Sequence, residues 1–364
     1  MRIAIIFFCL FWGGLAKAEL SARTVIESYI ANARADYLAA ASGAAELQNA
    51  IERFLLAPSP QTLSEARLAW IEARKLYSPT ETYRFYGGPI DAAEDGPEGL
   101  INSWPLDEAY IDYVVGNPNA GIINNSTIYP AITLELLEGL NEQGGEKNIS
   151  VGFHAIEFLL WGQDLSASGP GNRSYRDYVD GGARNADRRR TYLRLASAML
   201  VDKLNWVAAR WDSANPASYA QSFTSEGDLE ALRRILIGPY RMAREELSQE
   251  RMFVAYDTQS QEEEHSCFSD TTHLDIQFNF LGIRRVLEGS NVLELIRVRA
   301  PNLARDIDTQ LALAELTIMG IPAPFDNAIF SNDGRLAILR SVESLESLAD
   351  AIRAGAQSLG VALQ

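Results

Sequence analysis

The chain has 364 residues, with 32 Lys and Arg against 48 Asp and Glu, so its formal charge is −16. A surface this acidic repels nucleic-acid phosphates and anionic lipid headgroups, and we therefore exclude nucleic acid as a partner. Hydrophobic residues make up 47% and charged residues 22% of the chain, which is typical of a globular protein long enough to bury a large core.

The first 18 residues have the pattern of a cleaved secretory signal. Arg2 precedes an apolar run over residues 3–12, and Ala16-Lys17-Ala18 supplies small residues for cleavage. The run is shorter than the roughly 20 residues that a membrane-spanning helix needs. We predict cleavage after Ala18, export to the periplasm or cell envelope, and no transmembrane segment in the mature chain.

Cysteine usage follows from that cleavage. Cys9 lies inside the apolar run, so the exported chain retains Cys267 alone and cannot form an internal disulfide. We expect Cys267 to be a buried, unreactive thiol.

A first helix is predicted from Pro60, a favourable first helical position after Ser59, to Tyr77. If it continues past Pro79, it presents one face that combines aromatic and charged groups, namely Trp70, Arg74, Tyr77 and Glu81. Such a face suits the wall of a cleft better than a solvated surface, and we predict ligand contacts from Arg74 and Tyr77.

An irregular region follows over residues 86–105, with too many Gly and Pro residues for a continuous helix. At its start, the aromatic-rich and turn-rich segment 83–91 is typical of a binding loop. We predict ligand contacts there from Tyr83, Arg84 and Asp91.

The segment from Val151 to Trp161 is predicted to be a helix capped by Asn148 or Ser150. Its apolar residues surround the whole circumference, as in a buried helix. His154 and Glu157 lie at i and i+3 on one face, so they need partners in a low-dielectric interior. They form either a structural hydrogen-bonded pair or a metal or catalytic centre, to which Glu81 could add a second carboxylate.

The segment 166–172 combines small, breaker and turn residues, and we predict a domain boundary there. Beyond it, apolar residues recur at helical spacing over 186–211, 303–318 and 336–352. No convincing series of alternating strands occurs. We therefore predict an all-α fold of two packed helical-bundle halves, residues 19–165 and 174–364.

The segment 262–273 contains His265, Cys267 and His273. A zinc site is conceivable there, but the spacing matches no standard finger, and a closed site would lack one ligand. The simpler interpretation is that Asp270 or Thr272 caps the following helix. Standard hydrolase, nucleotide-binding and covalent haem motifs are absent from the chain.

The motif Gly152-x-His154-x-x-Glu157 resembles the G-x-H-x-x-E signature of the imelysin-like proteins, particularly the branch called iron-regulated protein A. The resemblance continues, in the right order, through residues 70–77, 80–91, 96–114 and 265–273. It implies an all-helical protein of two bundle-like halves, exported to the bacterial envelope, with the motif helix near the cleft between them.

The resemblance also implies a metal site, because founding members of the family are described as metallopeptidases and others are linked to iron regulation or uptake. His154 and Glu157 would be ligands of a divalent iron or zinc ion, with Glu81 as a candidate third ligand. His273 or Asp270 could contribute from the other half.

Three functions stay open at this point. The first is a periplasmic protein that binds iron or a small iron-containing ligand for uptake, with other envelope iron-uptake proteins as partners. The second is an imelysin-type metallopeptidase that uses the same site around zinc, although the usual H-E-x-x-H motif is absent. The third is a haem- or siderophore-associated module in which the segment 83–86 stacks on a flat ligand.

Overall fold

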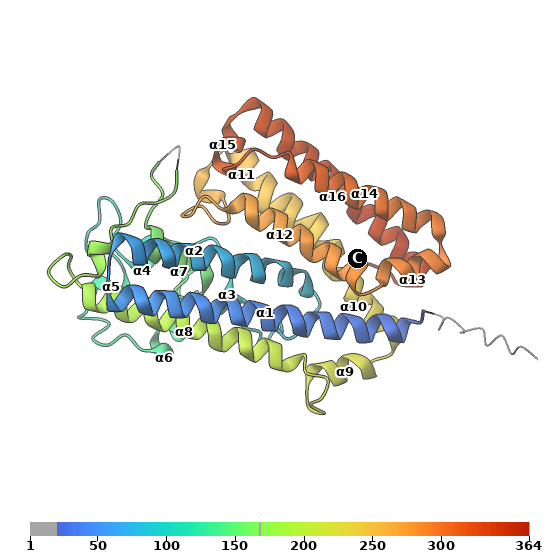
Figure 1. Cartoon of the computed structure of the whole chain (residues 1–364), viewed down its shortest axis with the longest axis horizontal. Coiled ribbons are helices and arrows are strands. Elements are labelled where there is room, and N and C mark those ends of the chain that lie inside the picture. The colour runs from blue at the N-terminus through green and yellow to red at the C-terminus, as the bar shows by residue number, and fades with distance from the viewer. Residues whose placement is uncertain (1–19, 167–168, 364) are drawn as a thin grey trace, which may run out of the picture.

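The computed structural model describes residues 20–166 and 169–363 (Figure 1), and within these ranges it is helical, without β-strands. This confirms the predicted all-α fold. The predicted signal segment lies outside the described residues. No helix in the described ranges is both long and apolar enough to cross a membrane.

One long side of the molecule is formed by helix α1 (Ala22–Leu56), on which both α2 (Pro60–Tyr77) and α8 (Ala186–Arg210) pack. Helix α2 begins as predicted. The Ser59 hydroxyl accepts a hydrogen bond from the Thr62 amide, and the Thr62 hydroxyl accepts one from the Ser59 amide, which satisfies two amides of the first turn. The buried helix α7 (Gly152–Trp161) packs against α2 and α8.

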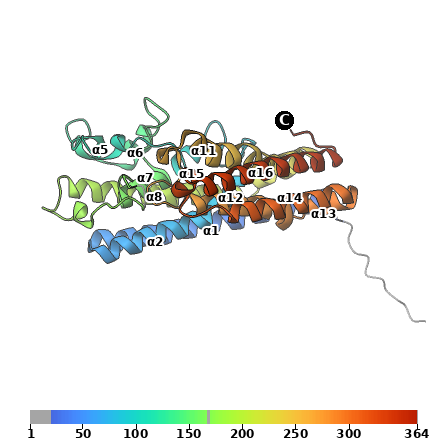
Figure 2. The same ribbon diagram turned by 90° about the horizontal axis from the view of Figure 1, so that it is seen from above.

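The other long side is formed mainly by α10 (Asp228–Arg241), α12 (Thr272–Arg284), α14 (Pro301–Met319) and α16 (Asn332–Ser358). Helix α10 continues directly into a π-helical segment, η3 (Met242–Phe253), which packs on α16 and α12. Seen from above, the long helices of both sides run close to the long axis of the molecule (Figure 2).

Shorter elements connect these helices. They are the 3-10 helices η1 (Ser78–Tyr83), η2 (Tyr175–Tyr178) and η4 (Gln261–Glu263), the π-helix η5 (Arg285–Gly289), and the short helices α3 (Glu98–Ile101), α4 (Glu108–Ile111), α5 (Gly121–Asn124), α6 (Leu134–Leu140), α9 (Tyr219–Ser225), α11 (Val254–Thr258), α13 (Val292–Arg299) and α15 (Phe325–Phe330).

The α-helix that begins at Pro60 does not survive Pro79. It ends at Tyr77, and the tighter helix η1 follows, so Glu81 does not continue the α-helical spacing, although its Oε1 atom still lies 3.9 Å from Arg74 Nη2. Helix α12 meets η1 at Gly282, where an added Cβ would lie 2.4 Å from the Pro79 carbonyl oxygen. A side chain at this position would push the two elements apart.

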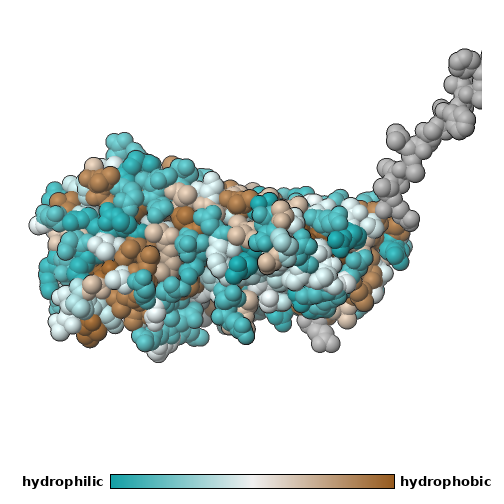
Figure 3. Space-filling view, turned by 90° about the horizontal axis from the view of Figure 1, so that it is seen from below, coloured by the Kyte–Doolittle hydropathy of each residue, from teal (hydrophilic) through white to brown (hydrophobic). Residues whose placement is uncertain are grey.

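The predicted boundary over residues 166–172 stays a prediction. Helix α8 begins beyond it, yet packs along α1. The face seen from below is mostly hydrophilic, with apolar residues in scattered groups (Figure 3). This distribution is typical of a protein surface in contact with water.

Asp112, which follows the short helix α4, forms buried ion pairs with Arg173 and with Arg189 of α8. Its carboxylate accepts hydrogen bonds from Arg173 Nη1 at 2.6 Å and from Arg189 Nε at 2.7 Å, and all three side chains are buried. Burial alone would raise the pKa of Asp112, but the two guanidinium groups outweigh it and lower the pKa from 3.8 to about 2.

We expect Asp112→Ala to lower the free energy of unfolding at neutral pH by about 3–5 kcal/mol, because two buried cations lose their partner. In the wild type, the contribution of this carboxylate is present above pH 3.8 and is lost as pH falls toward about 2. Urea unfolding at neutral and acid pH measures both effects. Asp180→Asn is the control, since Asp180 pairs with Arg190 at the surface and should change stability by only about 0.5 kcal/mol.

Candidate functional site

Helix α7 carries the G-x-H-x-x-E motif in a fully buried position, as predicted. The predicted caps were wrong: Val151 is the N-cap residue, without a side-chain hydrogen bond, and neither Asn148 nor Ser150 caps the helix. Gly152 has a φ of 91°, and a Cβ there would lie 2.7 Å from the Ile101 carbonyl oxygen. The glycine of the motif is therefore required by a left-handed backbone in a tight place.

His154 and Glu157 form the local pair that their spacing indicates, with His154 Nδ1 3.0 Å from Glu157 Oε2. The other oxygen, Glu157 Oε1, accepts hydrogen bonds from Ser269 through its amide at 2.9 Å and its hydroxyl at 2.7 Å. Ser269 belongs to the loop before α12. The motif helix is thereby joined to a segment more than one hundred residues further along the chain.

The same loop brings a second histidine to the site. His265 Nε2 lies 3.1 Å from His154 Nε2, and His265 Nδ1 lies 2.9 Å from Asp275 Oδ2 on α12. Both imidazoles are buried. The half-buried indole of Trp104 lies against them, with its ring centroid 5.0 Å from that of His154 and 6.3 Å from that of His265.

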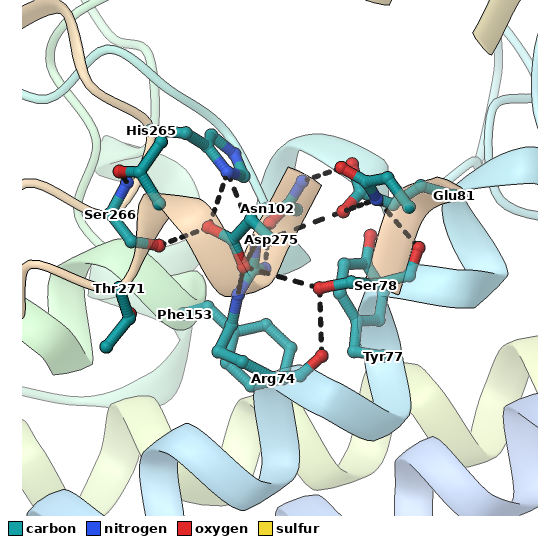
Figure 4. Close-up of polar contacts among 12 residues, drawn as sticks. Arg74, Tyr77, Ser78, Glu81, Asn102, Phe153, His265, Ser266, Thr271 and Asp275 are labelled. Atoms are coloured by element: carbon teal, nitrogen blue, oxygen red, sulfur yellow. Dashed lines mark hydrogen bonds and ion pairs between the residues drawn. The ribbon is translucent and has the colours of Figure 1, made fainter. Parts of the chain in front are cut away.

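Asp275 and Arg74 stand at the centre of the polar network (Figure 4). Arg74 donates to Asp275 Oδ1 through Nη2 at 3.0 Å and through Nε at 3.2 Å, and to the Asn102 side-chain carbonyl. Asp275 Oδ2 also accepts a hydrogen bond from the Ser266 hydroxyl. Arg74 comes from α2 and Asp275 from α12, so this ion pair joins the two sides of the molecule.

Glu157, His154, His265 and Asp275 thus form a row with three links. Burial is the main cause that lowers the pKa of both histidines well below 6.5, so both imidazoles are neutral at neutral pH. Burial also raises the pKa of Glu157 well above its usual range. Each of the three links needs one proton between its two atoms to be a hydrogen bond. The two neutral imidazoles supply two of these protons, so the third must be a proton on Glu157, or another cation must take its place.

Glu81 does not join this row, and its predicted role as a partner of His154 was wrong. Its carboxylate accepts hydrogen bonds from Arg251 at 2.8 Å, Asn279 at 3.0 Å and Asn102 at 3.1 Å. Burial would raise the pKa of Glu81, but the guanidinium groups of Arg251 and Arg74 outweigh it and lower the pKa. Glu81 is therefore a fully engaged anion, held away from the histidines because η1 replaces the expected helix.

In the predicted binding loop, residues 83–91, the side chains of Tyr83 and Asp91 make hydrogen bonds within the protein. Tyr83 is buried and donates to Asp36 at 2.7 Å. Asp91 accepts hydrogen bonds from the backbone amides of Phe85 and Gly88, which fixes the turn. Tyr83 offers no exposed ring face to a flat ligand, whereas Phe85 and Tyr86 are half-buried, so stacking by residues 83–86 stays a prediction.

Arg84 takes part in the buried charge network instead, whereas Tyr77 contributes only its ring, 5.5 Å from the Arg74 guanidinium. Arg84 lies 3.2 Å from Glu98 and 3.6 Å from Glu81. Burial raises the pKa of Tyr77 well above its usual range, and its hydroxyl has no hydrogen-bond partner. Of the predicted ligand-binding residues, Arg74 alone contacts the histidine row directly.

In the described residues, no hydrogen bond or ion pair joins His273 or Asp270 to His154, and the charge of Asp326 acts on both residues. Neither Asp270 nor Thr272 caps α12 with its side chain, as one of them was predicted to do, because the helix begins after Thr271 without a side-chain cap. The prediction for Cys267 is confirmed as to burial, which also raises the pKa of its thiol. Its lack of reactivity stays a prediction.

His265 lies in the candidate segment 262–273, but its contact with His154 was not predicted. The available signal was compositional, since two of the chain's three histidines fall within residues 262–273. In the described ranges, no three His, Cys, Asp or Glu side chains are grouped so as to hold a metal ion. A metal at the two histidines would need further ligands from the bound species or from water.

These features define an all-α protein with a buried row of histidines and carboxylates between two helical sides. The chain belongs to the imelysin family, whose model matches residues 33–352. Iron-regulated protein A of Synechococcus elongatus is 23% identical over 332 residues, which is 87% of this chain and 80% of that protein.

Two solved structures share the fold. The crystal structure of a candidate iron-regulated protein A precursor from Parabacteroides distasonis matches with a TM-score of 0.73 at 17% identity, covering 94% of this chain and 97% of that one. An imelysin-like protein from Psychrobacter arcticum matches with a TM-score of 0.68 at 15% identity, covering 95% and 98%.

We expect Arg74→Ala to lower the free energy of unfolding by about 3–5 kcal/mol, because it leaves Asp275 buried without its cation. Chemical denaturation at neutral pH measures the change. The control is Arg23→Ala, which removes an exposed ion pair with Glu27 and should cost less than about 1 kcal/mol. Equal losses in the two variants would contradict the central role of Arg74.

Proposed function

We propose that this imelysin-family protein binds a divalent metal ion, with iron as its cargo, between the imidazoles of His154 and His265. The observation that carries the proposal is the 3.1 Å approach of the two Nε2 atoms, each on a ring backed by a carboxylate. Histidine ligands of metals commonly donate their second ring N–H to a carboxylate, which orients the ring and raises its basicity.

The proton arrangement supports this role. In the metal-free protein, the proton on Glu157 faces His154 Nδ1, so the neutral His154 carries its own proton on Nε2 and donates it toward His265 Nε2, while His265 Nδ1 donates to Asp275. A metal ion between the two Nε2 atoms would take the place of the Nε2 proton of His154. The proton of Glu157 would then pass to His154 Nδ1, and one proton would leave the site, so binding and proton release would be coupled.

Iron is favoured as the ion because imidazole ligands suit it and because the similar Synechococcus protein is named for iron regulation. The metal would bring further ligands with it, since the described residues offer two histidines rather than a closed set. An incomplete set of protein ligands suits a carrier, because a carrier must release the metal that it binds. Export to the cell envelope and partnership with iron-uptake proteins belong to the same proposal.

Two features of the site weigh against the alternative, a zinc peptidase. Such an enzyme needs three protein ligands with an open position for water, and a groove that accepts an extended peptide. The His154 and His265 side chains are buried under Trp104, and their carboxylate partners are buried as well. This environment offers a peptide bond no direct approach.

Metal binding can be tested by titrating the mature chain with Fe²⁺ under anaerobic conditions and by measuring the metal content after dialysis. We expect about one ion per chain in the wild type. His154→Ala and His265→Ala should each weaken binding by at least about 100-fold, and Glu157→Gln or Asp275→Asn by about 10–100-fold. Far-UV circular dichroism checks that each variant is folded.

His273→Ala is the matched control, because it removes the remaining histidine, which makes no hydrogen bond with either imidazole of the pair in the described residues. It should bind metal as the wild type does. Binding that survives the loss of His154 and His265, or a wild type that takes up neither Fe²⁺ nor Zn²⁺, would refute the proposal.

Trp104 should control access to the site, because its half-buried ring covers both imidazoles. We expect Trp104→Ala to increase the rate of metal association, measured by stopped-flow mixing, with a smaller change in affinity. An unchanged association rate would mean that metal reaches the histidines from another side.

A further inference from the structure

A cavity of about 840 Å³ lies where the segment over residues 87–95 faces the end of α8 and the start of α9. Trp206 and Arg210 of α8 line it, together with Tyr219 of α9 and the turn that ends the predicted binding segment. No residue of the histidine row is among its lining residues. Binding sites for small molecules typically have volumes of about 300–1,000 Å³. We call this hollow the Trp206 cavity.

The walls of the Trp206 cavity are held in place by contacts within the protein. The Asp91 carboxylate accepts a hydrogen bond from the amide of the lining residue Gly88 at 2.7 Å, which fixes the turn on one side. On the other side, Arg234 donates to the Tyr219 hydroxyl at 2.9 Å, and the Tyr219 ring meets the buried Trp211 ring edge-on at 5.2 Å. The cavity is therefore formed before a ligand arrives, as small-molecule sites usually are.

Arg210 is oriented by the aromatic ring beside it. Its central guanidinium carbon lies 3.8 Å from the centroid of the Trp206 ring. In the described residues, this guanidinium accepts no hydrogen-bond partner, and its single ion-pair contact, with Asp95, is as long as 3.7 Å. The indole N–H of Trp206 likewise has no partner in the described part of the chain. The N–H donors of both side chains therefore remain available at the cavity wall.

A second stacked arginine shows that this lack of partners is not a result of stacking. Arg335 lies over the Tyr256 ring at the same distance of 3.8 Å. Its guanidinium, however, donates to the main-chain carbonyl groups of Tyr256 at 2.7 Å and of Ile329 at 3.0 Å. Arg335 thus joins segments of the fold, whereas Arg210 joins none. A stacked guanidinium with unused donors is suited to a carboxylate, which it binds through two parallel hydrogen bonds.

Ser218 adds a buried donor to the lining. It is 6% exposed, and its hydroxyl has no hydrogen-bond partner. A buried hydroxyl without a partner is unfavourable, and an acceptor on a ligand would satisfy it. Pro89, Ala92 and Ala217 contribute apolar surface to the same cavity. The lining therefore combines hydrogen-bond donors with apolar walls.

We propose that the Trp206 cavity binds a small organic carboxylate. The carboxylate accepts hydrogen bonds from Arg210, and the apolar body of the ligand packs against the apolar lining. In the empty cavity, Asp95 balances the charge of Arg210 from 3.7 Å, and the carboxylate of the ligand displaces it. A neutral sugar is the other class of ligand that aromatic and polar walls attract, but it would use Asp95 as an acceptor instead of displacing it.

The test is isothermal titration of the mature chain with 2-naphthoate, with the neutral 2-naphthamide as the matched probe. At neutral pH and about 0.15 M salt, the negative charge of the chain is screened beyond about 8 Å. We expect saturable binding of the acid and no measurable binding of the amide. The indole N–H signal of Trp206, assigned in nitrogen-15 spectra by Trp206→Phe, should shift with the acid. No binding of the acid, or equal binding of both probes, would overturn the proposal.

Two variants with opposite expected effects locate the binding. Arg210→Gln should weaken binding of the acid by at least about 10-fold. Asp95→Asn should strengthen it by about 2- to 5-fold, because a competing surface carboxylate is removed. The matched control is Arg353→Gln, since the Arg353 side chain is 40% exposed against 41% for Arg210 but does not line the cavity. It should bind as the wild type does.

Unchanged binding in Arg210→Gln would contradict the proposal. Weaker binding in Asp95→Asn would show that Asp95 accepts from the ligand, as a sugar requires, and would also contradict it. The result is independent of the proposed iron site. His154→Ala should bind the acid as the wild type does, and Arg210→Gln should leave Fe²⁺ binding unchanged. Loss of acid binding in His154→Ala would place the acid at the histidines and refute a separate site.

Discussion

The site depends on the ion pair between Arg74 and Asp275. These residues come from opposite helical sides, and each is buried where an unpaired charge would be severely destabilising. The two oxygens of the Asp275 carboxylate have different partners. Oδ1 accepts a hydrogen bond from Arg74, while Oδ2 contacts His265 and Ser266. Fixing that carboxylate fixes the imidazole of His265, which in turn meets His154. The packing of two helical layers and the alignment of two histidines are therefore one structural constraint.

The local part of this arrangement could be predicted from the sequence. An all-round apolar helix indicates burial, and the spacing of His154 and Glu157 indicates a pair, because both signals lie within one element. The contact with His265 joins residues 111 positions apart, so no periodicity could show it. Glu81 was misplaced for a local reason: Pro79 ends the α-helix, and the tighter turn of η1 directs Glu81 toward Arg251.

The loop before α12 has a different environment at each contact. Ser269 donates to Glu157 and His265 approaches His154, whereas Glu264 and Asp270 face other carboxylates. A single short segment thus contacts the hydrogen-bonded row at one end and a buried carboxyl group at the other, since burial raises the pKa of Glu264 to about 9. Glu264 immediately precedes His265, so the backbone that positions this imidazole also carries a protonated carboxyl group at neutral pH.

The π-helical segment η3 limits how this protein can tolerate a change in chain length. Glu246 and Arg251 are five residues apart and pair at 2.8 Å, while Arg251 also reaches Glu81 at the same distance. The backbone hydrogen bonds of a π-helix run from residue i to i+5, so residues five apart lie near one another, whereas in an α-helix of 3.6 residues per turn the same two side chains would point in different directions. Deleting one residue between Glu246 and Arg251 would keep Arg251 beside both carboxylates only if η3 tightened into an α-helix, in which residues four apart are neighbours. Without that change, Glu81 would stay buried without its main cation. A deletion that a surface loop would absorb should therefore force η3 to change its helix type, even though the segment lies outside the signature motif.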